Sequence, residues 1–83
     1  MQLRFIVFKE KDLWVARGLS YDFIGESSTK DGAITNFCLA VAAEYEFAKK
    51  DKRKPFEGLP KAQKSFLNWI RSKSNIEINL IQL

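Results

Sequence analysis

The most distinctive polar feature of the sequence is a run of cations at positions 49–54. Five of its six residues are basic: Lys49, Lys50, Lys52, Arg53 and Lys54. Such a run can contact the phosphates of a nucleic acid, and each contact releases counterions and makes binding salt-dependent. The simpler interpretation is a solvated helix end, where cations suit the negative end of the helix dipole. Base stacking would need exposed rings nearby, and Phe56 and Tyr45 are the closest in sequence.

The residue types that carry most enzyme chemistry are scarce. The chain has no histidine, which removes the commonest general base and metal ligand. Its single cysteine, Cys38, permits neither an internal disulfide nor a thiolate zinc site, and its apolar surroundings predict a packed side chain. Asp22 and Glu26 share one face of a predicted strand, and we interpret them as solvated polar positions. We therefore expect no enzyme activity, no cofactor and no metal.

The net charge of +4 is concentrated in one part of the chain. Residues 1–48 carry five basic and seven acidic side chains, whereas residues 49–73 carry nine basic and two acidic ones. Residues 49–73 therefore favour an anionic partner, whereas residues 1–48 are slightly acidic. A single cysteine and the lack of a long apolar stretch predict a cytoplasmic protein without a membrane segment.

Three short strands are predicted first in the chain. Residues 3–8 are almost continuously apolar, which indicates a strand covered on both faces. A polar turn leads to a second strand at 13–17, and a third follows over 19–26. Together they predict an antiparallel meander. We expect Trp14 to be part of the core.

Two helices and a last strand follow. Ser28 or Thr29 can cap a helix that ends near Lys49. Its apolar residues recur at spacings of three and four, which predicts one stripe packed on the sheet; these residues are Ala33, Ile34, Phe37, Cys38, Val41, Tyr45 and Ala48. A second helix is predicted from Pro60 to Ser72, with Trp69 in the core. Alternation after Ile76 predicts a strand with one buried face.

These elements predict one α+β domain over residues 1–83, with no separate DNA-binding domain. The expected order is βββ-α-α-β, with a small, mainly antiparallel sheet and one main helix packed on it.

Several segments resemble the HicB-like family in their order along the chain. In that family a strand ending in Ala precedes a Leu-x-Tyr-Asp-apolar strand, as in residues 13–16 and 19–23 here. The family's Gly-x-Thr-x-Glu-Glu-Ala segment is matched at Thr29, Asp31 and Ala33, while Ser27 and Gly32 differ from it. The segment from Pro55 to Pro60, with the aromatics Phe66 and Trp69 beyond it, is similar to the C-terminal stretch of stand-alone members.

The resemblance implies a degenerate ribonuclease-H-like fold without that fold's catalytic carboxylates. HicB proteins are antitoxins that mask a small RNA-cleaving toxin of the HicA type. The resemblance therefore implies a non-catalytic protein-binding module in a bacterial toxin–antitoxin system. A small nucleic-acid-binding protein that contacts phosphates through residues 49–54 is the alternative.

The last predicted strand also suggests self-association. It carries one charge, Glu77, and lacks the lysines and prolines that usually protect a sheet edge. We predict a homodimer in which residues 76–83 pair with or pack against the second subunit, through Ile76, Ile78, Leu80 and Ile81. The alternative places this strand inside its own sheet, beside residues 3–8 and covered on both faces.

Overall fold

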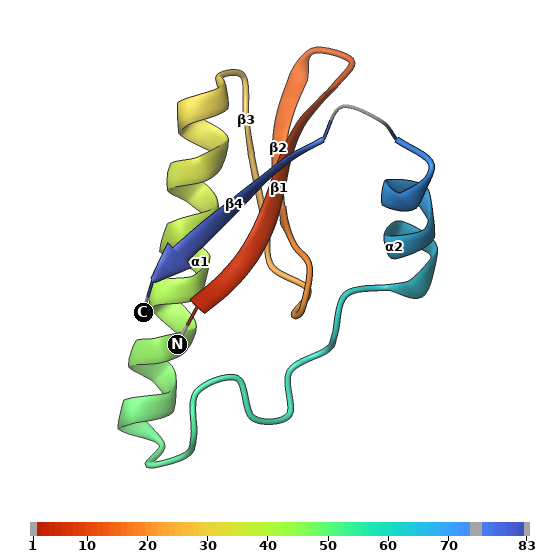
Figure 1. The fold of residues 1–83 in the computed structure, drawn as a ribbon. Helices are drawn as coiled ribbons and strands as arrows, with labels where there is room; N and C mark the ends of the chain where they lie inside the picture. Colours follow the sequence, from red (N-terminus) through yellow and green to blue (C-terminus); the bar gives the residue numbers. More distant parts are fainter. Residues whose placement is uncertain (1, 74–75, 83) are drawn as a thin grey trace.

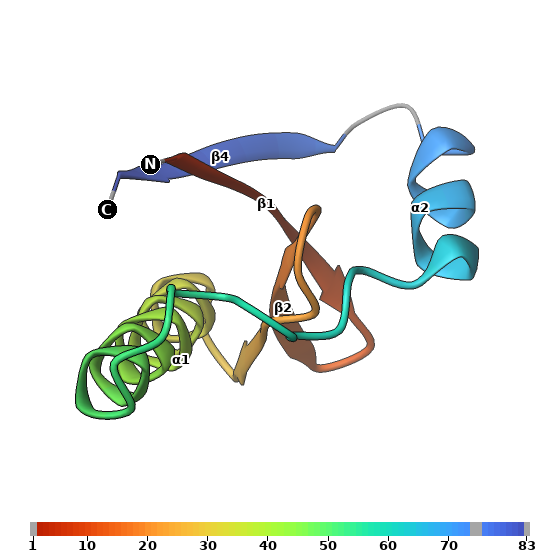
Figure 2. The same ribbon diagram turned by 90° about the horizontal axis from the view of Figure 1, so that it is seen from below.

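The computed structural model describes residues 2–73 and 76–82, and its elements follow the predicted order. They are β1 (Gln2–Glu10), β2 (Leu13–Gly18), β3 (Ile24–Ser27), α1 (Lys30–Lys50), α2 (Lys64–Arg71) and β4 (Glu77–Gln82). The strands form one antiparallel sheet in the order β3-β2-β1-β4. Figures 1 and 2 show α1 and α2 on opposite sides of this sheet. The predicted α+β class is thus confirmed.

The main core lies between α1 and one face of the sheet. Leu3, Phe5 and Val7 alternate along β1 and are almost fully buried. Phe37 of α1 is fully buried and stacks on Phe5, with 4.5 Å between ring centroids. A Cβ atom at Gly25 of β3 would overlap the α1 backbone, so only glycine allows this close approach. The helix covers this face mainly over β3 and β2.

The predicted apolar stripe of α1 is confirmed. Its fully buried residues repeat at spacings of three and four, and Ile34, Cys38 and Tyr45 are partly buried against the same core. The N-cap is Thr29, whose hydroxyl accepts a hydrogen bond from the backbone N–H of Gly32 at 3.0 Å. Thr29 therefore caps the helix in place of Ser28. The periodicity did not single out Glu44, which is also buried in the helix.

The connector after α1 packs through Phe56, which is 2% exposed. Its ring stacks on Tyr21 at 5.1 Å and meets the edges of Phe23 and Tyr45. Phe56 adopts a positive φ of 67°, which turns the chain inward at this point. Both rings considered for base stacking, Phe56 and Tyr45, therefore belong to the packed interior.

The second helix begins later than predicted. Residues 60–62 are extended and pair with the segment before β3, where the amide of Asp22 donates to the carbonyl of Pro60 at 3.0 Å. These hydrogen bonds replace the helical ones that a start at Pro60 would require. The helix consequently starts at Lys64 and has only eight residues. No helix among the described residues is long and apolar enough to cross a membrane.

The second face of the sheet carries the alternate residues of β1. Ile6 is fully buried there. Phe8 contacts α2, with its ring 5.0 Å from Trp69 and 6.5 Å from Phe66. The prediction that both faces of this strand are covered is therefore confirmed at Ile6, although Arg4 is exposed.

The last strand lies within its own sheet, paired antiparallel with β1 from Gln2↔Gln82 to Val7↔Glu77. The place beside residues 3–8 agrees with the alternative prediction, but the coverage of both faces that this alternative expected is wrong. Its burial is the reverse of what the alternation suggested: Ile81 packs against the core, whereas Ile78 and Leu80 are each 57% exposed. The register is the reason, because it places Ile81 opposite Leu3 on the α1 side.

Candidate functional site

Four large apolar side chains are exposed on the sheet face opposite α1. Residues directly opposite one another in an antiparallel pair share a face, and the registers place all four with Ile6 and Phe8. We call this surface the open face; its residues are Leu13, Ile24, Ile78 and Leu80. Their exposed fractions range from 42% to 57%. Clustered exposure of this kind is typical of interaction surfaces.

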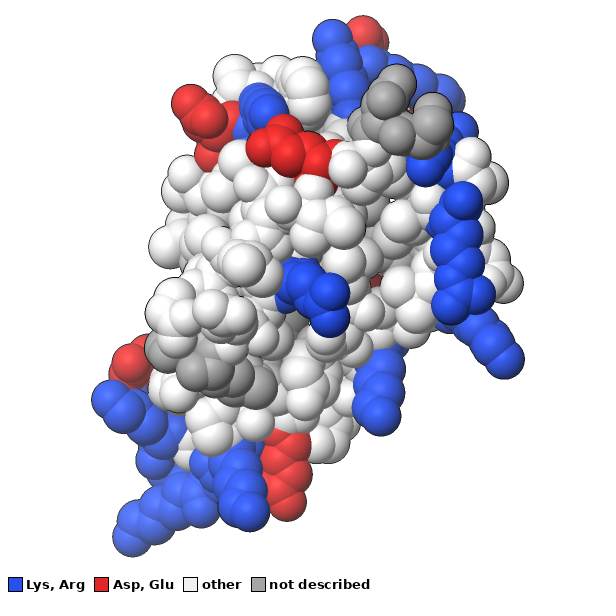
Figure 3. Space-filling view, viewed as in Figure 1, with Lys and Arg blue, Asp and Glu red and all other residues white. Residues whose placement is uncertain are grey.

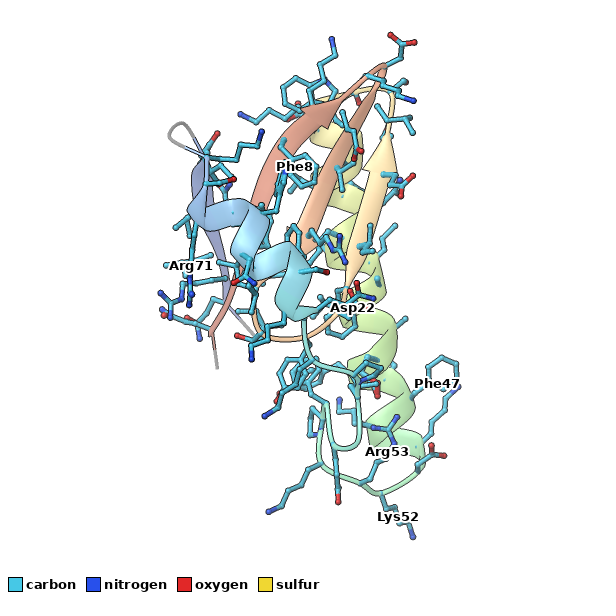
Figure 4. The ribbon with its side chains drawn as sticks, turned by 90° about the vertical axis from the view of Figure 1, so that its right-hand side faces the viewer. Phe8, Asp22, Phe47, Lys52, Arg53 and Arg71 are labelled. Atoms are coloured by element: carbon cyan, nitrogen blue, oxygen red, sulfur yellow. The ribbon has the colours of Figure 1, made fainter. Side chains whose placement is uncertain are left out.

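The helix α2 crosses the open face and covers only its middle. Figure 4 shows α2 in front of the sheet, beside Phe8. Phe66 is buried under the helix, and the Arg17 guanidinium lies 4.0 Å from its ring centroid. Trp69 is 38% exposed, in contrast to its predicted place in the core, and Lys73 lies 5.2 Å from its ring. An exposed Trp on an apolar surface is a common centre of binding energy.

The two ends of the open face differ in charge. At the β1–β2 turn, a shallow hollow of about 410 Å³ next to Leu13 is lined by three acids, Glu10, Asp12 and Glu26, and by one cation, Lys11. These carboxylates are exposed, and none forms an ion pair with another described residue. At the other end, a second hollow of about 430 Å³ includes two arginines; it is lined by Arg4, Leu19, Ser20, Leu67, Ile70 and Arg71.

Figure 3 views the molecule from the side of β4. Uncharged surface occupies much of this view, with one cationic side chain near its centre and most of the other charged side chains toward the margin.

The structure separates Arg53 from the other predicted anion contacts. Arg53, labelled in Figure 4, forms ion pairs with the buried Glu44 and with Asp51. Its hydrogen bond with Glu44 is the main reason that the pKa of Arg53 lies above its ordinary value. Glu44 and Asp51 thus engage this guanidinium, whereas the contact of Arg53 with an anion stays a prediction.

The four remaining cations of the run stay exposed. Lys49, Lys50, Lys52 and Lys54 make no ion pair with another described residue. They lie at the end of α1 that is remote from the β1–β2 turn (Figures 1 and 4). The basic run and the acidic end of the open face thus occupy distant parts of the molecule.

The weaker candidates do not assemble into a reactive centre. Asp22 precedes β3 and lies 3.6 Å from Arg17 in an ion pair, while Glu26 lies at the hollow near the β1–β2 turn. Within residues 2–73 and 76–82, no three His, Cys, Asp or Glu side chains are grouped so as to hold a metal ion. Cys38 is a free, partly buried thiol packed against the core.

The predicted self-association residues fall into two groups. Ile78 and Leu80 belong to the open face, whereas Ile76 and Ile81 are half-buried. Sequence reasoning missed two further exposed residues on the outer side of α1, Leu39 and Phe47. Leu39 and Phe47 lie eight residues apart, and neither belongs to the buried stripe. This spacing was the available signal.

Comparisons with known proteins do not identify the chain. No family model matches it, and neither a curated protein nor a solved structure matches it.

Proposed function

We propose that this chain is a non-catalytic protein-binding module of the HicB antitoxin type, whose partner is a small RNA-cleaving toxin similar to HicA. The observation that carries the proposal is the open face, where four large apolar side chains flank α2. Covering such side chains stabilises a complex by about 25 cal/mol per Å² of apolar surface removed from water. The order of HicB-like motifs along the chain supplies the class of partner.

The charge distribution supports a basic partner at one end of the open face. An RNA-binding toxin is expected to be basic, and Glu10, Asp12 and Glu26 supply exposed carboxylates next to Leu13. Complementary charges at an interface steer encounter and fix orientation. The lysines of residues 49–54 would repel such a toxin, but they lie at the far end of α1 (Figure 1).

Co-expression with a HicA-like toxin encoded by the neighbouring gene tests the proposal. The wild-type chain is expected to restore growth and to elute with the toxin as one complex. Leu80→Asp places a charge in the middle of the contact and is expected to weaken binding at least tenfold. Leu39→Asp is the matched control, because Leu39 is equally exposed but lies on α1. Equal toxin binding by both variants and the wild type would contradict this use of the open face.

Nucleic-acid binding is the second candidate, and one observation favours it. Arg53 pairs with Glu44 and Asp51, while the four neighbouring lysines are exposed and form no ion pair with another described residue. Four phosphate contacts on a single strand would give a log–log salt slope of about −3. Fluorescence anisotropy with a labelled single-stranded RNA measures this slope. Replacing Lys49, Lys50, Lys52 and Lys54 by Ala should remove the binding, whereas binding that salt does not weaken would exclude this candidate.

A further inference from the structure

The strand β4 is the last one in the sheet order β3-β2-β1-β4, so its outer edge pairs with no described strand. The amide of Leu19 donates to the carbonyl of Arg4 at 3.0 Å, which shows that Arg4 directs its backbone groups toward β2. Successive residues of a strand direct these groups to opposite sides. Phe5 therefore faces β4, and the register leaves Ile78 and Leu80 with their backbone N–H and C=O groups at the outer edge.

This edge lacks the features that normally prevent a sheet edge from pairing. The strand Glu77–Gln82 contains neither Lys nor Pro. Its one charged side chain, Glu77, forms an ion pair with Lys30 of the same chain at 2.9 Å. Figure 3 views the molecule from this side, and uncharged surface occupies much of the view. An edge without such protection is a template for a further strand.

The central residues of β4 are complementary to a second copy of themselves. With a twofold axis at Asn79, antiparallel pairing places Ile78 of one chain opposite Leu80 of the other, twice. Each of these pairs exchanges two backbone hydrogen bonds, and their side chains, each 57% exposed, cover one another on the open face. An axis at Leu80 would instead place Ile78 opposite Gln82 and lose this apolar contact.

The side chain of Asn79 favours the same axis for an independent reason. Its Nδ2 atom is buried and forms no hydrogen bond with another described residue. A buried donor without an acceptor is unfavourable. Across the axis the two copies of Asn79 would form a closely spaced pair. Since an amide group has both a donor and an acceptor, the two side chains can hydrogen-bond to each other.

The rest of the molecule leaves room for this arrangement. The axis is perpendicular to the sheet, so the two copies of α1 lie on the same face of the joined sheet. The helix lies mainly over β3 and β2, and Figure 2 shows it away from β4. The two copies of Arg4, which lies opposite Leu80 in β1, are separated by three strand spacings, about 14 Å. This distance exceeds the Debye length of about 8 Å in physiological salt.

We propose that a second copy of this chain pairs antiparallel with the outer edge of β4, with Asn79 on the twofold axis, and that the two sheets join into one. The pairing of β4 with β1 uses the opposite edge of the strand, so its place in its own sheet is compatible with the predicted homodimer. The joined sheet carries the two open faces on the same side. The proposal does not rest on the antitoxin function.

Sedimentation equilibrium of the chain alone, between about 10 and 500 µM, tests the association. The wild type is expected to dimerise. Leu80→Pro removes a backbone N–H that points away from β1, as edge strands tolerate, and is expected to raise the dissociation constant at least tenfold. Leu80→Ala is the matched control, because it keeps this N–H, and it should dimerise more tightly than Leu80→Pro. Circular dichroism verifies that both variants are folded.

Three outcomes of this experiment would contradict the proposal. A wild type that is monomeric at 500 µM overturns it and leaves the edge to a different strand. Equal dimerisation of Leu80→Pro and Leu80→Ala shows that the backbone edge is not used. Leu13→Asp alters the open face at β2, remote from β4, and should leave the dimer intact; a dimer that it abolishes and Leu80→Pro spares lies elsewhere.

Cross-linking tests the position of the axis. In a Cys38→Ala background, Asn79→Cys places two thiols in a closely spaced pair, whose Cβ atoms lie about 4.5–5.5 Å apart, near the range for a disulfide. A disulfide-linked dimer is expected under mild oxidation. Glu77→Cys is the matched control, because its two copies would lie about 13 Å apart along the strands. Equal cross-linking of the two variants overturns the register. Both experiments omit the toxin, so this proposal and the proposed function can fail independently.

Discussion

The two faces of the sheet are built from alternate residues of the same strands but are covered to very different extents. On one face a 21-residue helix covers the strands, and Leu3, Phe5 and Val7 are almost fully buried. On the other, an eight-residue helix covers the middle and leaves Ile78 and Leu80 largely exposed. The comparison indicates that the first face supplies most of the stability, while the second leaves apolar surface exposed.

The largest effect is expected from Phe37→Ala on the α1 side. Phe37 is fully buried and its ring stacks on Phe5, so truncation leaves a cavity that the helix and sheet cannot close. The free energy of unfolding should fall by about 3–5 kcal/mol in chemical denaturation. Leu39→Ala, on the exposed side of the same helix, should change it by less than about 0.5 kcal/mol. A loss below 1 kcal/mol for Phe37→Ala would show that this face does not dominate stability.

Phe66→Ala should have an intermediate effect on the α2 side. The side chain is buried against Phe8 and Arg17, but α2 is short and can detach without leaving an enclosed cavity. We expect the free energy of unfolding to fall by about 2 kcal/mol, the value of the buried apolar surface alone. Asn68→Ala, on the exposed side of α2, is the control. An effect as large as that of Phe37→Ala would show that both faces contribute equally.

The smallest changes in the free energy of unfolding are expected for two neighbouring residues of β4, whose side chains point to opposite faces of the sheet. Ile81→Ser removes a side chain that packs against the core and should cost about 1–2 kcal/mol of unfolding free energy. Leu80→Ser alters a side chain that is 57% exposed and should change stability by less than about 0.5 kcal/mol. Thermal unfolding of both variants gives the difference. Equal losses would indicate that the open face is covered within the chain.

The parts of the fold that follow from local periodicity were predictable from the sequence. The stripe through Ala33, Phe37 and Val41 has helical spacing, and a helix with one apolar stripe buries it against the nearest sheet. The three strands before it are separated by polar or glycine-containing turns, which mark their ends. The element order was therefore correct without any knowledge of long-range contacts.

The errors arose where the outcome depends on residues distant in sequence. Alternation in β4 indicates two faces but does not say which one is covered; the pairing of Ile81 with Leu3 decides this. The ion pair between Arg53 and Glu44, which sets Arg53 apart from its basic neighbours, is likewise not visible in the sequence. The late start of α2 depends on the pairing of Lys61 with Tyr21, which lies forty residues earlier in the chain.

The candidate surfaces were visible only in part. Ile78 and Leu80 were predicted as self-association residues, and both are exposed. Leu13 and Ile24 lie on the same face of the sheet as these two residues. The strand register places them there, and the sequence does not specify that register. On α1, the sequence analysis considered only the buried stripe. It therefore did not identify Leu39 and Phe47, which are exposed.

The pairing of β1 with β4 has a consequence for the order in which the protein matures on the ribosome. The strand at Gln2–Glu10 is synthesised early, but its partner at Glu77–Gln82 emerges only after both helices. Until then one edge of β1 presents unpaired backbone groups, a known template for intermolecular pairing. Closing so long a loop also slows folding relative to local contacts. The nascent chain is thus open to intermolecular pairing along this edge of β1 until β4 has been made.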